Sequence, residues 1–175
     1  PFPIPHSPFP ITQTKTKTKT KTMTIGILTT DIDLIIRSWD PRLAEMTGMT
    51  AEVVCGLPLT QIIPDLESRG LKEAFDRTLT EGVVETLSPG LHHYLILCQP
   101  KTPSKYFDRM QQRVTIAPLR QNETVVGAIV TIEDVTTRLN DERSLAETLE
   151  RSEVRGKRSE VFEVRGQRSE VREIG

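Results

Sequence analysis

The apolar pattern changes its period at one point near the C-terminal end of the chain. Residues 125–132 form a largely apolar run rich in β-branched side chains, which is typical of a strand. Beyond Asp134 the apolar positions fall at mostly helical spacings among charged residues, at Leu139, Leu145, Ala146 and Leu149. The sequence therefore predicts a strand that passes directly into an outgoing helix.

Four residues connect this strand to the helix: Asp134, Val135, Thr136 and Thr137. The short side-chain oxygens of Asp and Thr can accept hydrogen bonds from the free N–H groups in the first turn of a helix. We predict that these residues cap the helix and transfer a mechanical signal out of the domain. A capping role alone explains them almost as well.

Near the N-terminus, two short strand-like segments, residues 26–30 and 34–39, are joined by an acidic turn and predict a hairpin. Asp40 can cap a following helix, and Pro41 suits the first helical position because its missing N–H costs nothing there. Gly48 suits the left-handed residue that ends a helix. The pattern thus predicts a helix directly after the hairpin.

Two more helical segments are expected before the chain returns to strands. A short one spans residues 50–56, and a longer one begins at Asp65 and ends at Gly82. The longer segment carries an apolar stripe at helical spacing, formed by Leu71, Ala74, Phe75, Thr78 and Leu79.

Strand-like patterns then recur at residues 83–87, 91–98, 111–119 and 124–132. Residues 99–108, with Pro100 and Pro103, form a loop between them. Strands, short helices, further strands and an exit helix indicate an α+β fold with an antiparallel sheet.

The two ends of the chain differ from its centre. Residues 1–22 combine prolines with alternating Lys and Thr and offer no apolar face, so we expect a disordered arm, or else a basic or targeting segment. Residues 23–137 form the domain, with Met23 a candidate start of translation, and residues 138–155 form an exit or linker helix. Residues 156–175 repeat the sequence Arg-Ser-Glu-Val and form a low-complexity tail, or else a partner-binding helix.

Charge and composition exclude several classes of function. Residues 23–137 contain ten basic and fifteen acidic residues, a balance opposite to that of a nucleic-acid-binding surface. No apolar run approaches the roughly 20 residues needed to cross a bilayer, so we expect a cytoplasmic protein. Cys55 and Cys98 lack partners at metal-site spacing, and we expect both to be buried free thiols.

The order of Trp39-Asp40, Thr47-Gly48, Val53-Val54-Cys55-Gly56, Gly127 and Asp134-Val135-Thr136 resembles that of a PAS domain. The resemblance covers about residues 25–137, with Asp40 where the family usually has Asn. It implies a five-stranded antiparallel sheet with short helices on one face and a C-terminal exit helix. It also implies a sensor or a dimerisation platform in signalling proteins.

The same resemblance allows two cofactors to be tested. The flavin-binding type needs an Asn-Cys-Arg motif, whereas Cys55 lies in Val-Cys-Gly, and the haem-binding type places a His on the longer helix, where residues 66–82 have none. We therefore predict no cofactor or metal, with haem and flavin not expected. Trp39 and His93 remain the candidates for lining a ligand site, because His92 and His93 would face opposite sides of the strand at 91–98.

These observations predict a non-enzymatic signalling module that senses a small ligand or mediates protein association, and transmits through its C-terminal helix. The expected partners are a second copy of the chain or a signalling protein. The alternatives are a ligand-free dimerisation or adaptor domain, or a nonfunctional remnant of a larger sensor protein. Asp31, Asp33 and His93 are the best candidates for a general base, but none has an identifiable partner group.

Overall fold

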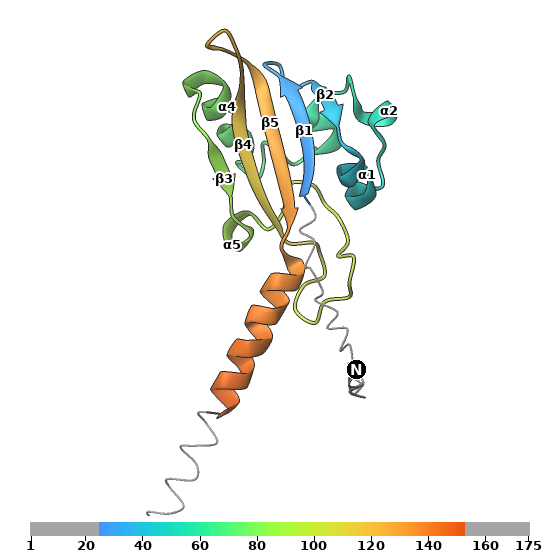
Figure 1. The fold of residues 1–175 in the computed structure, drawn as a ribbon, viewed down its shortest axis with the longest axis vertical. Helices are drawn as coiled ribbons and strands as arrows, with labels where there is room; N and C mark the ends of the chain where they lie inside the picture. The colour runs from blue at the N-terminus through green and yellow to red at the C-terminus, as the bar shows by residue number, and fades with distance from the viewer. Residues whose placement is uncertain (1–24, 153–175) are drawn as a thin grey trace, which may run out of the picture.

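A computed structural model of the chain describes residues 25–152. The arm predicted for residues 1–22, the repeat tail at 156–175 and the end of the segment at 138–155 lie outside the described residues. The elements are β1 (Ile25–Asp31), β2 (Ile36–Trp39), α1 (Pro41–Thr47), α2 (Ala51–Val54), α3 (Leu59–Ile62), α4 (Lys72–Glu81), β3 (Glu85–Leu87), α5 (Pro89–His92), β4 (Gln112–Gln121) and β5 (Thr124–Asp134). A final helix over residues 136–152, the exit helix, projects away from the sheet (Figure 1).

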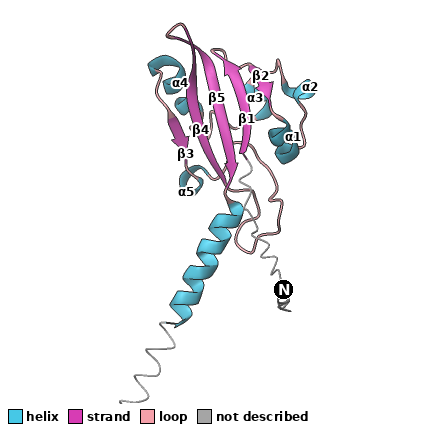
Figure 2. Ribbon diagram, viewed as in Figure 1, coloured by secondary structure: helices cyan, strands magenta, loops and turns pink. Residues whose placement is uncertain are grey.

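The strands form one five-stranded antiparallel sheet in the order β2-β1-β5-β4-β3 (Figure 2). β1 pairs with β5 along its whole length, from Ile25 opposite Glu133 to Asp31 opposite Gly127. A Cβ atom at Gly127 would overlap the carbonyl oxygen of Thr30, so glycine permits the close approach of these strands. The opening hairpin and the last strand are therefore joined continuously.

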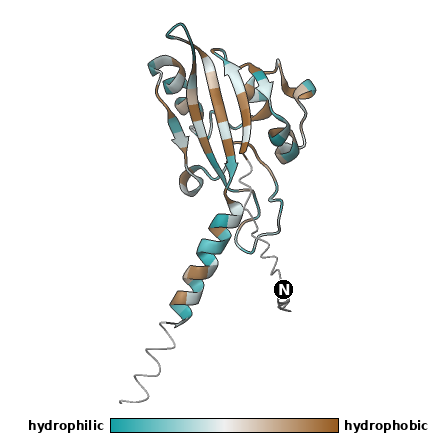
Figure 3. Ribbon diagram, viewed as in Figure 1, coloured by the Kyte–Doolittle hydropathy of each residue, from teal (hydrophilic) through white to brown (hydrophobic). Residues whose placement is uncertain are grey.

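The short helices cover one face of the sheet, and the hydrophobic core lies between these helices and that face. Buried positions alternate along the central strands, and the apolar bands on the strands are visible in Figure 3. Phe75 of α4 is fully buried in this core, and burial of such a side chain stabilises the fold by about 1.5–3 kcal/mol. On the three central strands, the buried side chains of the inner face are Leu28, Val114, Ile116, Ala128, Val130 and Ile132, with the polar Thr30 and Gln112.

The predicted capping of the first helix is confirmed. Asp40 Oδ1 accepts a hydrogen bond from the Leu43 N–H at 2.7 Å, and Gly48 ends the helix with a φ of 76°. The prediction that the longer helix begins at Asp65 is wrong, because residues 64–70 form turns and Gly70 takes a φ of 68°. α4 begins only at Lys72, and the sequence patterns had not indicated α3.

The prediction of a strand at residues 91–98 is also wrong. Pro89 opens the short helix α5 there, His93 follows it with a φ of 61°, and residues 94–98 are irregular. His92 is the last residue of α5 and His93 follows it, so the two histidines do not face opposite sides of a strand, and β3 pairs directly with β4. Cys98 is buried as expected, whereas Cys55 is exposed at the end of α2. Within residues 25–152, no helix has the length and apolar character to cross a membrane.

Candidate functional site at the joint between the sheet and the exit helix

Gln111, the residue directly before β4, is hydrogen-bonded to the start of the exit helix. The Val135 N–H donates to the Gln111 carbonyl at 2.9 Å, and the Gln111 N–H donates to Thr136 Oγ1 at 2.8 Å. Thr136 and Gln111 are both buried. The helix begins where the Leu139 N–H donates to the Val135 carbonyl. Its first turn is therefore attached to the neighbouring strand as well as to β5.

The four residues predicted at this joint have different surroundings. Asp134 accepts a hydrogen bond from the Thr136 N–H at 3.0 Å, so its carboxylate does satisfy an N–H group at the start of the helix. The Thr136 hydroxyl instead accepts the N–H of Gln111, 25 residues away in the sequence. Thr137 is exposed. The joint thus depends on Asp134, Val135 and Thr136, together with Gln111, which the sequence had not indicated.

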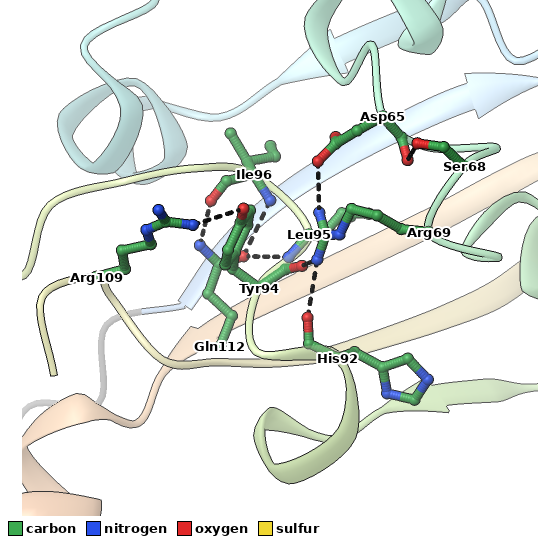
Figure 4. A network of polar contacts seen from close by, with 9 residues as sticks. All are labelled: Asp65, Ser68, Arg69, His92, Tyr94, Leu95, Ile96, Arg109 and Gln112. Carbon is green, nitrogen blue, oxygen red and sulfur yellow. Dashed lines mark hydrogen bonds and ion pairs between the residues drawn. The ribbon is translucent and has the colours of Figure 1, made fainter.

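Gln112, the first residue of β4, holds the irregular segment that follows α5 (Figure 4). Its Oε1 accepts from the N–H groups of Leu95 at 2.9 Å and Ile96 at 3.2 Å, and its Nε2 donates to the Ile96 carbonyl. All three residues are buried. One side-chain amide therefore supplies the hydrogen bonds that a paired strand would have supplied.

Arg69 anchors the same segment from the other side (Figure 4). Its guanidinium donates to the carbonyls of His92, at 2.8 Å, and Tyr94, and it lies 4.2 Å from the centre of the Tyr94 ring. Asp65 forms an ion pair with Arg69 at 3.4 Å. Residues 92–96 are thus held between Arg69 and Gln112, and Gln112 adjoins the residue that binds the exit helix.

The loop before β4 docks on the exit helix. The contacts are Ser104 Oγ to Asn140 Oδ1 at 2.7 Å, Lys105 Nζ to Glu147 Oε2 at 2.7 Å, Tyr106 OH to Ser144 Oγ at 3.2 Å, and Arg143 over the Phe107 ring at 4.4 Å. Positions 140, 143, 144 and 147 share one face of a helix. The hydrogen bond from Lys105 lowers the pKa of Glu147 and keeps its carboxylate charged. This loop therefore supports about two turns of the helix.

Cys98 lies near the acidic end of the joint. Burial, followed by the charge of Asp134, raises the pKa of the Cys98 thiol to about 11. The thiol is therefore protonated at neutral pH, and a protonated thiol is a poor nucleophile.

The two candidate ligand-lining residues lie apart from each other. Trp39 is 5% exposed, and its Nε1 donates to the Met49 carbonyl at 2.9 Å, so its contacts are those of a packed core residue. The carbonyl of His93 accepts the Gln112 N–H at 3.0 Å, and its exposed side chain lines a surface cleft. Among residues 25–152, no three His, Cys, Asp or Glu side chains are grouped as metal ligands would be.

The fold can be compared with the folds of known proteins. No family model and no curated protein matches the chain. Among solved structures, an RNA-binding light-oxygen-voltage receptor superposes with a TM-score of 0.51 at 18% identity, over 74% of this chain and 34% of that one. This chain therefore spans about a third of that receptor.

Two shorter structures superpose less closely. A sensory box sensor histidine kinase from Vibrio cholerae gives a TM-score of 0.47 at 16% identity, covering 64% of this chain and 82% of that one. The PAS domain of a Colwellia psychrerythraea protein gives 0.46 at 18%, covering 65% and 88%. Together with the strand order 2-1-5-4-3 and the C-terminal helix, the match to the light-oxygen-voltage receptor shows that the described part of this chain has the PAS fold.

Proposed function

We propose that this chain is a non-enzymatic signalling module that senses a small molecule or mediates protein association, and passes its state to the exit helix. The observation that carries the proposal is the bonding of Gln111 to Val135 and Thr136. Residues 141–146 of the helix are exposed. Because most of the stability of a helix in a protein comes from the packing of one face, we infer that the order of this helix depends on its contacts with the domain.

The proposed transmission uses two neighbouring residues of the chain. Gln112 binds the segment at Leu95 and Ile96, and Gln111 binds the start of the helix. A ligand or partner that shifts this segment would therefore also shift the strand end that holds the helix. Such a change moves a population between docked and released helix states, as in other order–disorder switches.

Association of two copies is supported by exposed apolar side chains. On the uncovered face of the sheet, Ile25, Ile27 and Leu119 are 38%, 37% and 40% exposed. On the exit helix, Leu145 and Leu149 are 61% and 57% exposed. These positions favour a homodimer or a signalling partner, and they equally suit the alternative of a ligand-free dimerisation or adaptor domain.

Native mass spectrometry, absorbance and analytical ultracentrifugation of the protein purified from its own host test the proposal. We expect a bound small molecule, a dimer, or both. Bands at about 400–450 nm would contradict the prediction of no haem or flavin. A monomer without any added mass, at every concentration, would overturn the proposal and favour the nonfunctional remnant. A ligand-free dimer would favour the adaptor.

A further inference from the structure

A cleft of about 460 Å³ opens beside the joint, between α5, the loop before β4 and the exit helix. Its aromatic walls are Tyr94, Tyr106 and Phe107, and the exit helix contributes Leu139 and Arg143. A smaller hollow of about 310 Å³ adjoins it and shares Tyr94. Small-molecule sites commonly occupy about 300–1,000 Å³, so the cleft is large enough for a compact ring with one substituent.

The charges around the cleft are mainly positive. Arg109 enters from the loop and Arg143 from the exit helix. The carboxylate among the lining residues belongs to Asp108, which forms an ion pair with Arg109 at 3.8 Å. Because the Asp108 side chain is 89% exposed, solvent screens this pair, and a ligand anion can compete for Arg109. An anion in the cleft would therefore meet two guanidinium groups from two different segments.

Both guanidinium groups are held by aromatic rings. Arg143 lies 4.4 Å from the centre of the Phe107 ring, and Arg109 donates to the Tyr94 hydroxyl at 3.1 Å. When the face of a guanidinium stacks on an aromatic ring, the N–H groups at its edge remain free to donate to a carboxylate. Neutral aromatic groups thus position both arginines, and Arg109 in addition forms the exposed ion pair with Asp108.

We propose that this cleft binds a small aryl carboxylate, with its ring against Tyr94, Tyr106 and Phe107 and its carboxylate on Arg109 and Arg143. Such a ligand bridges the loop and the exit helix. An effect of this bridge on signalling rests on the proposed function, whereas binding in the cleft does not.

Titration of the full chain with benzoate, followed by calorimetry and by NMR, tests the site. Acetate carries the charge without the ring, and benzyl alcohol carries the ring without the charge. We expect benzoate to bind with a dissociation constant on the order of 1 mM, as suits so small a ligand, and both control probes to bind about tenfold more weakly or worse. Equal binding of acetate, or of inorganic phosphate, would overturn the aryl carboxylate and indicate a plain anion site.

Substitution of the arginines adds a residue-level test. Arg143→Gln and Arg109→Gln should each weaken benzoate binding about tenfold, because each removes a charge-assisted hydrogen bond. Arg42→Gln, at an exposed arginine of α1 paired with Glu45, is the matched control and should leave the affinity unchanged. Unchanged affinity in both cleft variants would overturn the proposal. Circular dichroism confirms that each variant is folded.

Hydrogen exchange with and without benzoate distinguishes binding in the cleft from an effect of that binding on the exit helix. Slower exchange over residues 139–150 in benzoate would support the bridge between the loop and the helix. Binding without any change in exchange would support the site but contradict its link to signalling. Absence of binding would overturn the site alone, and would leave the proposed role of the joint to its own test.

Discussion

Gln112 makes the most exacting prediction about the stability of the fold. Its side chain is 1% exposed and satisfies three backbone groups, the N–H of Leu95 and both the N–H and the carbonyl of Ile96. Gln112→Leu keeps a similar size but leaves these groups without a partner in the interior. Because Leu95 and Ile96 are themselves buried, water cannot readily take the place of the amide.

The magnitude follows from the hydrogen bonds that are lost. Each buried backbone group left unpaired costs at least about 1 kcal/mol. The additional apolar burial of leucine offsets about 1 kcal/mol of that cost. We expect a net loss of about 2–3 kcal/mol in the free energy of unfolding, out of a total of about 5–15 kcal/mol for a typical domain.

Urea unfolding, followed by the fluorescence of the single tryptophan, Trp39, measures this loss. With a denaturant slope of about 1.5 kcal/mol per molar, the midpoint should fall by between about 1 and 2 M. Gln121→Leu, at the exposed end of the same strand, is the matched control and should change the midpoint little. A midpoint for Gln112→Leu equal to that of the control would refute the reasoning.

Three further predictions concern single buried groups. Since burial raises the pKa of Cys98 from 9.0 to about 11, the unfolded chain loses the thiol proton first, so stability should fall between pH 9 and 11 and fall less in Cys98→Ala, as measured by urea unfolding at each pH. Thr78 has a buried hydroxyl without a hydrogen-bond partner in the described structure, so Thr78→Val should stabilise the fold by about 1 kcal/mol, and a loss of stability would contradict this. Gly127→Ala would place a methyl group against the Thr30 carbonyl and should cost about 2 kcal/mol or more in the same assay, whereas Gly90→Ala, which has open space, should unfold like the wild type.

Local chemistry explains which elements were predictable from the sequence. The first helix is defined within a few residues, by the Asp40 carboxylate at its start and the left-handed Gly48 at its end. The last strand and the exit helix differ in apolar period, so their boundary near Thr136 could be located to within about two residues. In each case the deciding interaction lies close in the sequence.

The errors occur where the deciding contact is distant. Residues 91–98 have the apolar content of a strand, but the groups that satisfy them come from Arg69 and from Gln112, more than fifteen residues away. The hydrogen bond of Gln111 to Thr136 spans 25 residues. Two adjacent amides at the start of a strand whose buried positions are otherwise apolar were the available signal for both contacts. Gly70 likewise interrupts a continuous helical pattern that its neighbours favour.

Hydrogen exchange over residues 139–150 in Thr136→Val tests the central claim, that the sheet holds the exit helix through the joint. This substitution removes the acceptor of the buried Gln111 N–H, while Thr137→Val changes an exposed hydroxyl one residue further along. We expect helix amides to exchange about five- to thirtyfold faster in Thr136→Val, which corresponds to about 1–2 kcal/mol, and at the wild-type rate in Thr137→Val. Equal exchange in both variants would contradict the account.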